Sequence, residues 1–434
     1  MSSLTRKSVS SVEEVSPYPI EAFQEVTSLL QRSYVTDISE EEAVKLNHAA
    51  IRGMLAELHD PYARFMEPEE YKSFVNEYEG YIEGIGATLE MTEALTPLTY
   101  RITRVSAKGF EAEYVSDSPL HKQYWPSITA LIPGGPAEHA GLKPGDQILE
   151  IEGISTFGMN ISEAAKLIRG APGTSVALLI QREAHSKPIE FKIVRRNVYI
   201  PTVEQRVLEG DIGYLRITSF NDQTVKLTAD ALTELESKGI RGLVLDLRDN
   251  PGGELDVCLG VAEMFVPEGP IVYIQAKNSE PEPVFASGRA RDPGLPLIVL
   301  VNQGSLSASE ILAGAIQDSG VGKVIGERTF GKGLVQRTRQ LTDGSAVRIT
   351  TARYLTPKKR EVNGRGILPD KEVEQPEGVV KPLSDEDLQA KAAIEMLKAE
   401  IALRPASPPR HGQRSAGATA RKRISSRSRP AGQI

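Results

Sequence analysis

Apolar residues recur with helical spacing at the start of the chain. Four of them fall on one face of a predicted helix: Phe23, Val26, Leu29 and Leu30. A second amphipathic stretch follows the acidic sequence that begins at Ser39, which is typical of a helix start. From Tyr81 onward, short alternating runs separated by Gly and Pro turns predict strands instead. The pattern therefore predicts a helical region over residues 17–79 and a β-rich unit over residues 80–198.

Strands and helices alternate in the second half of the chain. Residues 213–218 and 242–246 predict strands, and residues 222–235 between them predict a helix. This strand-helix-strand order favours a parallel sheet covered on both faces. The apolar run 297–301 predicts a further buried strand. We therefore expect an α/β core over residues 199–380.

The composition fits a folded α/β protein with many turns. The 434 residues are 40% hydrophobic and include 37 Gly and 28 Pro, and this length is typical of about three domains. The single cysteine, Cys258, excludes an intramolecular disulfide and a cysteine metal cluster. Because Cys258 lies in an apolar helical run, we expect it to be buried in a core.

The two ends of the chain differ in character from its middle. Residues 404–434 hold eight Lys and Arg and no Asp or Glu, and their Ser, Pro, Ala and Gly content predicts a disordered basic tail. No aromatic residues are interleaved to stack on bases, so nucleic acid is not an expected partner; contact of this tail with nucleic acid or anionic lipid is the alternative. Residues 1–16 are polar and Ser-rich, without the apolar core of a secretory signal, and no run has the length of a membrane span.

Three serines stand at alternate positions after the strand predicted over residues 297–301, where an amphipathic helix begins: Ser305, Ser307 and Ser309. A hydroxyl at this place lies beside unpaired helix N–H groups, which stabilise negative charge developing on an oxygen. Ser307 and Glu310 also fit the S-x-x-E capping box, in which the hydroxyl only accepts a backbone N–H, and this pattern alone favours capping. Ser309 could equally be the cap, which would leave Ser307 free.

A lysine on a glycine-flanked turn favours the catalytic interpretation of these serines. Lys332 follows another predicted strand in the sequence Gly-Lys-Gly. A lysine can take the proton of a serine only when it is neutral, and burial lowers the lysine pKa toward that state. The same segment, residues 326–333, differs in one residue from a phosphate-binding P-loop, but the Ser or Thr that would hold Mg²⁺ is missing. Nucleotide binding is therefore the disfavoured alternative.

Four motifs in this order resemble the carboxyl-terminal processing proteases, which are PDZ-containing serine peptidases with a Ser/Lys dyad. The motifs are VLDLRDNPGG from residue 244, IVLVNQGSLSASEIL from residue 298, IGERTFGKGLVQ from residue 325 and VRITTARYLTP from residue 347. The resemblance covers residues 20–375. It implies an α/β fold with a ClpP/crotonase-like protease core, an inserted PDZ domain and a helical N-terminal cap region beside the core.

The resemblance also implies catalytic roles. Ser307 matches the nucleophile, Lys332 its general base, and Gln336 the residue that orients the lysine amine. In such a mechanism the lysine takes the serine proton and later gives it to the leaving amine. No metal and no other cofactor is implied. The expected activity is that of a serine endopeptidase that cleaves proteins or peptides with accessible C-termini, near those termini.

A glycine-rich loop follows the strand predicted over residues 242–246. Glycines at a strand-to-helix turn can expose backbone N–H groups, as an oxyanion hole requires, although the loop alone favours a tight structural turn. By resemblance, the donors are the N–H groups of Gly253 and Ala308, with Gly252 as the alternative to Gly253. Asp249 stands where the family more often has asparagine, so the hydrogen bonding of this loop is an open point.

The β-rich unit resembles a PDZ domain with an insertion. In PDZ domains a glycine loop captures the terminal carboxylate of a peptide, and a strand edge pairs with the peptide. The residues that match this loop and the neighbouring groove are Gly84, Ile85, Gly86, Ile161, Ala165 and Ile168. Residues 93–127 form an insertion whose alternation predicts an added hairpin, and Trp125 is expected to serve packing. Arg169 matches a position that couples PDZ binding to the active site, while a surface arginine bridging two domains is the alternative.

Two other functions stay open as alternatives. One is a catalytically silent PDZ binding scaffold, which the presence of all three catalytic groups disfavours. The other is an acyl-CoA enzyme with a crotonase-like core, which the PDZ-like unit disfavours. Compartment and oligomeric state are undetermined, since family members mostly work outside the cytoplasm while no secretory signal is visible. The predicted organisation is 1–16 disordered, 17–79 helical, 80–198 PDZ domain with its insertion, 199–380 protease core, 381–403 C-terminal helix and 404–434 basic disordered tail.

Overall fold

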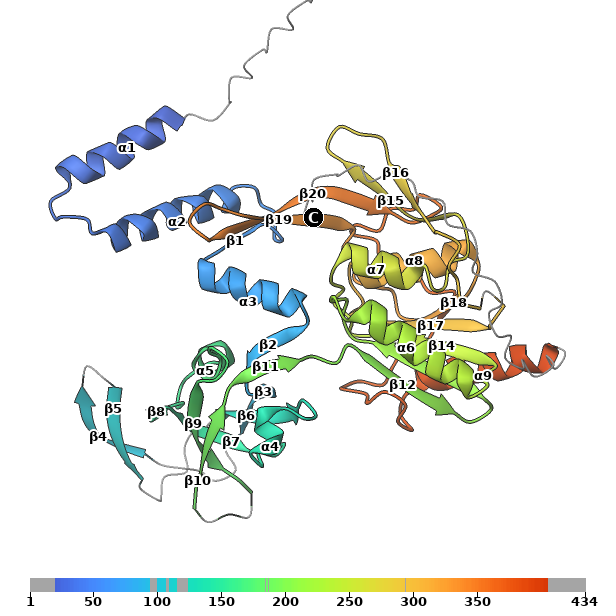
Figure 1. The fold of residues 1–434 in the computed structure, drawn as a ribbon, viewed down its shortest axis with the longest axis horizontal. Coiled ribbons are helices and arrows are strands. Elements are labelled where there is room, and N and C mark those ends of the chain that lie inside the picture. Colours follow the sequence, from blue (N-terminus) through green and yellow to red (C-terminus); the bar gives the residue numbers. More distant parts are fainter. Residues whose placement is uncertain are drawn as a thin grey trace, which may run out of the picture.

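An N-terminal helical arm, a small β-rich unit and a larger α/β core make up the molecule (Figure 1). The computed structural model describes residues 20–93, 100–106, 109–114, 124–183, 185, 187–292 and 294–404. The disordered ends predicted at residues 1–16 and from 405 to 434 lie outside the described residues. None of the described helices has the length and apolar character needed to cross a membrane.

A six-stranded sheet forms the centre of the α/β core. Its strands, in spatial order, are β12 (Val203–Leu208), β13 (Ile212–Ile217), β14 (Gly242–Asp246), β17 (Leu297–Val301), β18 (Lys323–Gly326) and β21 (Lys371–Glu372). The pairings from β13 to β21 are parallel, whereas β12 is antiparallel to β13. The predicted α/β core with its parallel sheet is confirmed.

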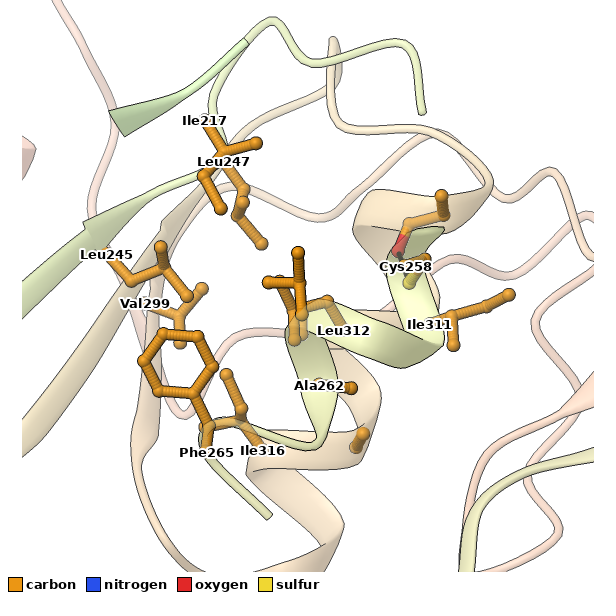
Figure 2. Packing of buried hydrophobic residues seen from close by; sticks show 14 of the residues in the cluster. Ile217, Leu245, Leu247, Cys258, Ala262, Phe265, Val299, Ile311, Leu312 and Ile316 are labelled. Atoms are coloured by element: carbon orange, nitrogen blue, oxygen red, sulfur yellow. Dashed lines mark hydrogen bonds between the residues drawn. The ribbon is translucent and has the colours of Figure 1, made fainter. Parts of the chain in front are cut away.

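Helices cover both faces of this sheet, as parallel strands with continuous apolar runs require. On one face lie α6 (Thr224–Ser237), α7 (Leu255–Ala262) and α8 (Ala308–Ser319), and on the other lies α9 (Leu388–Leu403). Figure 2 shows apolar side chains of α7 and α8 packed against Leu245 and Val299 of the sheet. Cys258 is fully buried in this cluster, and its burial raises the pKa of the thiol.

A second sheet joins the N-terminal region to the core. Its strands are β1 (Arg64–Met66), β15 (Pro270–Ala276), β16 (Glu282–Phe285), β19 (Leu334–Gln340) and β20 (Ala346–Leu355). β1 pairs antiparallel with β20, so that Arg64 lies directly opposite Arg348. The arm is therefore anchored to the core by main-chain hydrogen bonds.

The N-terminal arm consists of three helices interrupted by strand β1. The helices are α1 (Ile20–Ser33), α2 (Glu40–Ala56) and α3 (Pro68–Tyr78). The strand forms because Phe65 and Met66 become buried against the core, and Pro68 then begins α3 at a position where a missing N–H costs nothing. Helical periodicity alone did not indicate this strand, since its stability comes from its pairing with residues far along the chain.

The β-rich unit is a PDZ domain inserted between the arm and the core. Its sheet contains β3 (Ala87–Glu93), β6 (Tyr124–Leu131), β7 (Gln147–Ile151), β8 (Ile154–Ser155), β9 (Ser175–Gln181) and β10 (Ile189–Val194), with helices α4 (Pro136–His139) and α5 (Ile161–Ile168). The entering strand β2 (Tyr81–Gly84) pairs antiparallel with the leaving strand β11 (Arg196–Tyr199). The two connections to the rest of the protein therefore lie side by side.

The insertion contains the expected hairpin. β4 (Tyr100–Ser106) and β5 (Gly109–Tyr114) pair antiparallel with each other, apart from the PDZ sheet. β6 already begins at Tyr124, so the last residues of the insertion predicted over 93–127 belong to the PDZ sheet. Trp125 is fully buried beside Leu149, because this early part of β6 covers the domain interior, and it serves packing as expected.

A buried ionic network ties α9 to the core. The guanidinium of Arg248 lies 2.6 Å from Asp246 and 2.7 Å from Asp387, and all three residues are buried. Asp387 also caps α9 by accepting the N–H of Ala390 at 3.0 Å. Burial would raise the pKa of Asp387, but Arg248 and the N–H donors prevail and lower it to about 2. A charged Asp387 is therefore built into the fold.

Replacing Asp387 by alanine should destabilise the protein strongly. The Asp387→Ala change leaves Arg248 partly unpaired in the interior and removes the cap of α9, so we expect the free energy of unfolding at pH 7 to fall by about 3–5 kcal/mol. Urea unfolding followed by circular dichroism measures this loss.

The exposed pair of Lys226 and Asp230 on α6 provides the control. Asp230→Ala should change the free energy of unfolding by less than about 0.5 kcal/mol. The pKa of folded Asp387 is depressed, so its contribution is present above the ordinary aspartate pKa of 3.8 and is lost as the pH falls toward 2. Equal losses in the free energy of unfolding for Asp387→Ala and Asp230→Ala would contradict the importance of the network.

Candidate active site

The three alternating serines differ in what their hydroxyl groups do. The Ser305 hydroxyl donates to the carbonyl oxygen of Leu247 at 2.8 Å, and the Ser309 hydroxyl donates to that of Asn250 at 2.9 Å. Both serines are fully buried. They hold the start of α8 against the loop that follows β14, whereas Ser307 between them is only half-buried and lines a pocket.

Ser307 has a strained backbone at the start of α8. Its dihedral angles are φ 53° and ψ −112°, a conformation that costs a non-glycine residue about 1–3 kcal/mol. Its N–H donates to the carboxylate of Glu310 at 2.9 Å, but its hydroxyl makes no cap hydrogen bond of normal geometry. The capping-box pattern is therefore present, with the Glu310 carboxylate accepting the Ser307 N–H, and Ser307 lines the pocket.

Two backbone N–H groups next to Ser307 lack an acceptor within the described part of the chain. They belong to Gly253 and Ala308, which both line the same pocket. The N–H of Gly252, in contrast, donates to the side chain of Asn250 at 2.8 Å. A side chain at Gly252 would also clash with the Leu306 carbonyl oxygen, at 2.8 Å from an added Cβ. Of the three N–H groups, those of Gly253 and Ala308 are thus without an acceptor among the described residues, and that of Gly252 is not.

The loop tolerates Asp249 through a reciprocal pair of hydrogen bonds. The Asp249 N–H donates to the side-chain oxygen of Asn302 at 2.9 Å, and the Asn302 amide donates back to the Asp249 carboxylate at 2.8 Å. Asp249 adopts φ 57°, a left-handed conformation that aspartate accepts more readily than most residues. The open point about this loop is therefore answered by a partner from the loop after β17.

The glycine-rich turn before β19 wraps around the carboxylate of Glu310. This fully buried carboxylate accepts the Thr329 hydroxyl at 2.5 Å, the Gly331 N–H at 2.7 Å and the Lys332 N–H at 2.8 Å, besides the Ser307 N–H. Burial raises the pKa of Glu310, and these donors oppose the rise. The N–H groups of Gly331 and Lys332 are therefore bonded to an internal carboxylate and are not available to a phosphate, which argues against a phosphate-binding P-loop.

Tyr354 makes a second link between the segments of Ser307 and Lys332. Its buried hydroxyl lies 3.0 Å from the Ser307 carbonyl oxygen and 2.6 Å from the Lys332 carbonyl oxygen. Burial raises the pKa of Tyr354 well above its ordinary value, so the hydroxyl remains a donor. Together with Glu310, it fixes the main chain at both positions.

The amine of Lys332 lies over the ring of Tyr62, with 4.6 Å between the nitrogen and the ring centroid. Burial lowers the lysine pKa, and the charge of Arg348 lowers it further, while Asp60 and Glu310 oppose the shift. Within the described residues, the amine forms no hydrogen bond with the Ser307 hydroxyl.

Gln336 lies in the same pocket as Ser307 but points elsewhere. Its side-chain nitrogen is 3.4 Å from the Thr350 hydroxyl, and it is not bonded to the amine of Lys332. The structure thus brings the main chains of the predicted catalytic residues together, while their functional atoms are not yet engaged with one another.

The pocket beside Ser307 has a volume of about 50 Å³. Apolar and polar side chains both line it, and Glu254 and Arg348 are the two charged residues of its wall. The lining comprises Gly253, Glu254, Leu255, Ser307, Ala308, Ile311, Leu334, Val335, Gln336, Arg348 and Tyr354. Among the described residues, no three His, Cys, Asp or Glu side chains are grouped so that they could hold a metal ion.

The predicted peptide-binding residues lie together in the PDZ domain, away from the pocket. Ile85 and Ile168 are buried in the PDZ core, whereas Ile161 and Ala165 are half-buried on α5, which packs beside β3. Arg169 is exposed at the end of α5 and lies next to the predicted carboxylate loop, since a Cβ added at Gly84 would be 4.0 Å from its Cα and Cγ.

Several residues of the site were not found by reasoning from the sequence. Glu310 was recognised only as a capping residue, and Tyr62, Arg348 and Tyr354 were not singled out at all. Arg348 and Tyr354 belong to the fourth motif, VRITTARYLTP. Their place in this motif was the signal from which they could have been recognised as site residues. Tyr62 had no such signal, because only the folding of the arm places it at Lys332.

Comparison with known proteins gives consistent matches along the chain. Residues 211–373 match peptidase family S41, residues 127–182 match a PDZ domain, and residues 2–70 match the N-terminal domain of the activating protease CtpB. A carboxyl-terminal-processing protease of Synechocystis sp. is 36% identical over 82% of this chain and 78% of its own length. The carboxy-terminal processing protease CtpA of Bacillus subtilis is 36% identical over 82% and 72%, respectively.

A solved photosystem II D1 C-terminal processing protease is 32% identical, with a TM-score of 0.47, over 81% of this chain and 92% of that one. The expected resemblance is thereby confirmed at the level of the sequence, and the alternative of an acyl-CoA enzyme is not supported. The chain belongs to the carboxyl-terminal processing proteases, serine-type peptidases of family S41 that carry a PDZ domain.

Proposed function

We propose that this protein is an endopeptidase that cuts substrates near their C-termini with Ser307 as nucleophile and Lys332 as general base. The observation that carries the proposal is the surroundings of Ser307. Ser307 lines a pocket from a strained position at a helix start, together with Gly253 and Ala308, whose N–H groups lack an acceptor among the described residues.

Catalysis starts when neutral Lys332 takes the proton of the Ser307 hydroxyl. The oxygen then attacks the scissile carbonyl, and the resulting oxyanion accepts the N–H groups of Gly253 and Ala308. The Lys332 ammonium gives its proton to the leaving amine as the C–N bond breaks, and an acyl-enzyme ester remains on Ser307. Water, deprotonated by Lys332, hydrolyses the ester and regenerates both groups.

Two side-chain movements prepare this reaction. The amine of Lys332 must leave the ring of Tyr62 and turn toward Ser307, and Gln336 must exchange Thr350 for the lysine amine. Glu310 and Tyr354 already hold the main chain of Lys332, and the pairing of β19 with β20 holds that of Gln336, so both movements are changes of side-chain rotamer. The described arrangement is therefore a resting state that becomes active without refolding.

The PDZ domain recognises the substrate C-terminus and gates the active site. The loop of residues 84–86 offers backbone N–H groups to a terminal carboxylate, and β3 offers an edge to the peptide. Arg169 lies beside this loop, so a bound carboxylate changes its surroundings directly. A silent PDZ scaffold is the alternative, and it is disfavoured because Glu310 ties the main chain of Ser307 to that of Lys332.

Substitutions at the dyad should abolish proteolysis. Ser307→Ala removes the nucleophile, and Lys332→Arg keeps a positive charge that cannot be deprotonated, so we expect each to reduce kcat/KM at least about a thousandfold. Cleavage of casein, read by mass spectrometry of the fragments, measures the effect.

Arg337→Lys on β19 serves as the control for the lysine substitution and should cleave like the wild type. Circular dichroism must show that all variants are folded. If wild type cuts and Lys332→Arg cuts equally well, Lys332 is not the base. An inert wild type that stays inert with added apolar C-terminal peptides would favour the scaffold.

The pH dependence of turnover should report the lowered pKa of Lys332. Because the neutral amine is the active form, kcat/KM is lost as the pH falls below the lysine pKa and levels off above it. The midpoint should lie below the ordinary lysine value of 10.5. Rates on one peptide between pH 6 and 10.5 give the profile, and a midpoint at or above 10.5 would exclude a lysine base of this kind.

Removing Arg169 should uncouple the PDZ domain from the protease. We expect Arg169→Ala to reduce turnover of a protein substrate about tenfold or more without lowering the unfolding temperature, because the residue is exposed. Lys166→Ala, an exposed change one turn earlier on α5, provides the matched control. Unchanged turnover of Arg169→Ala, or an equal loss in both variants, would argue against this gate.

A further inference from the structure

One wall of the pocket beside Ser307 carries a positive charge that the catalytic roles do not use. Arg348 on β20 lines this pocket, in which Leu255, Ile311 and Val335 present apolar side chains. The charge therefore lies where a substrate residue next to the scissile bond would be bound.

The guanidinium of Arg348 has no anionic partner in the described part of the chain. Its side chain forms no hydrogen bond or ion pair there, and its contact is with the ring of Phe74 on α3, 5.5 Å from the centroid. The guanidinium of Arg64 lies at the same distance from this ring and is likewise without an ion pair.

Two arginines thus converge on one aromatic ring at the junction of arm and core. Arg64 and Arg348 are directly opposite residues of β1 and β20, a register in which like charges repel. Burial and the charge of Arg64 lower the pKa of Arg348, yet a guanidinium stays charged in this environment. Such a site gains stability from an anion, and a guanidinium presents a fork of donors that matches a carboxylate.

Glu254 is the acidic residue of the pocket wall, but it makes no ion pair with Arg348. Burial raises the pKa of Glu254 to about 7 against the attraction of Arg348, and the neighbouring Asp256 and Asp222 add to the rise. Below pH 7 Glu254 is mostly neutral, so the charge of Arg348 is least compensated there. Lys332 adds a further cation nearby when it is protonated.

We propose that Arg348 is a specificity-determining residue that binds a carboxylate of the substrate within the pocket beside Ser307. The carboxylate is either the side chain of an acidic residue flanking the scissile bond or the C-terminus of a short tail beyond it. A pocket of about 50 Å³ accepts a group of this size. This inference rests on the proposed peptidase function and adds a substrate preference to it.

Matched peptides that differ only in a carboxylate test the proposal. One pair carries Asp or Asn at each residue flanking a scissile bond first mapped by mass spectrometry. A second pair ends one or two residues beyond that bond in a free carboxylate or a carboxamide. The measured quantity is the ratio of kcat/KM for the acid to kcat/KM for its amide, so that general effects on the rate cancel.

In wild type the acid should be preferred about tenfold or more in at least one pair, since a hydrogen bond to a charged group contributes about 1.5–3 kcal/mol. Arg348→Gln should bring this ratio to one or below, and Arg348→Lys should keep part of it. Arg353→Gln on the same strand is the control, because Arg353 is exposed and lies 3.8 Å from Glu361. Its ratio should match that of wild type.

The two pairs separate the two sources of the carboxylate. Since the PDZ loop also binds terminal carboxylates, only the part of the ratio that Arg348→Gln removes is assigned to the pocket. The wild-type ratio should also be larger at pH 6 than at pH 8, because Glu254 gains its charge between these values. Equal ratios in wild type and Arg348→Gln for every pair would overturn the proposal.

A binding measurement keeps this inference distinct from the proposed function. Fluorescence anisotropy of the same labelled peptides with Ser307→Ala, with and without Arg348→Gln, needs no cleavage. If no peptide is ever cut but the acid preference in binding disappears with Arg348→Gln, the carboxylate site stands and the protease proposal fails. If peptides are cut and neither assay shows a preference that depends on Arg348, the protease proposal stands and the carboxylate site fails.

Discussion

The whole site depends on a single buried carboxylate. Glu310 accepts hydrogen bonds from the main chain of Ser307 and from that of Lys332, two residues on different loops of the core. A carboxylate away from water is costly unless several donors satisfy it, and the turn of residues 329–332 supplies three. Because the carboxylate of Glu310 must be satisfied by donors from both loops, it fixes the position of the Ser307 loop relative to the Lys332 loop. This constraint, and not direct contact between the side chains of Ser307 and Lys332, fixes the relative position of the two segments.

The surrounding architecture explains why those loops lie where they do. The carboxyl ends of β14, β17 and β18 point to one edge of the parallel sheet, and each continues into a segment of the site. The sheet therefore delivers the loop of Gly253, the strained Ser307 and the lysine turn to one place. The hydroxyls of Ser305 and Ser309 then bond the segment of Ser307 to the loop that follows β14.

Reasoning from the sequence reached the parts of the molecule whose signal is local. The strand over 242–246, the parallel sheet and the fully buried Cys258 all follow from periodicity. The S-x-x-E pattern at Ser307 was also real, but the sequence could not show that the carboxylate of Glu310 also accepts the N–H groups of Gly331 and Lys332. Strand β1, the ring of Tyr62 over Lys332 and the facing arginines were out of reach, because each depends on pairing between the two ends of the chain.

That pairing has a consequence for folding during synthesis of the protein. Arg64 meets its partner Arg348 only after residue 348 has left the ribosome, and α9 is tied to the core still later, when Asp387 reaches Arg248. Domains made early fold early during synthesis, so the PDZ domain can form before Lys332 reaches the ring of Tyr62. A nascent chain of this kind carries a recognition domain but no assembled cutting site. The order of its contacts thereby delays the junction of arm and core until both of the facing arginines have been made.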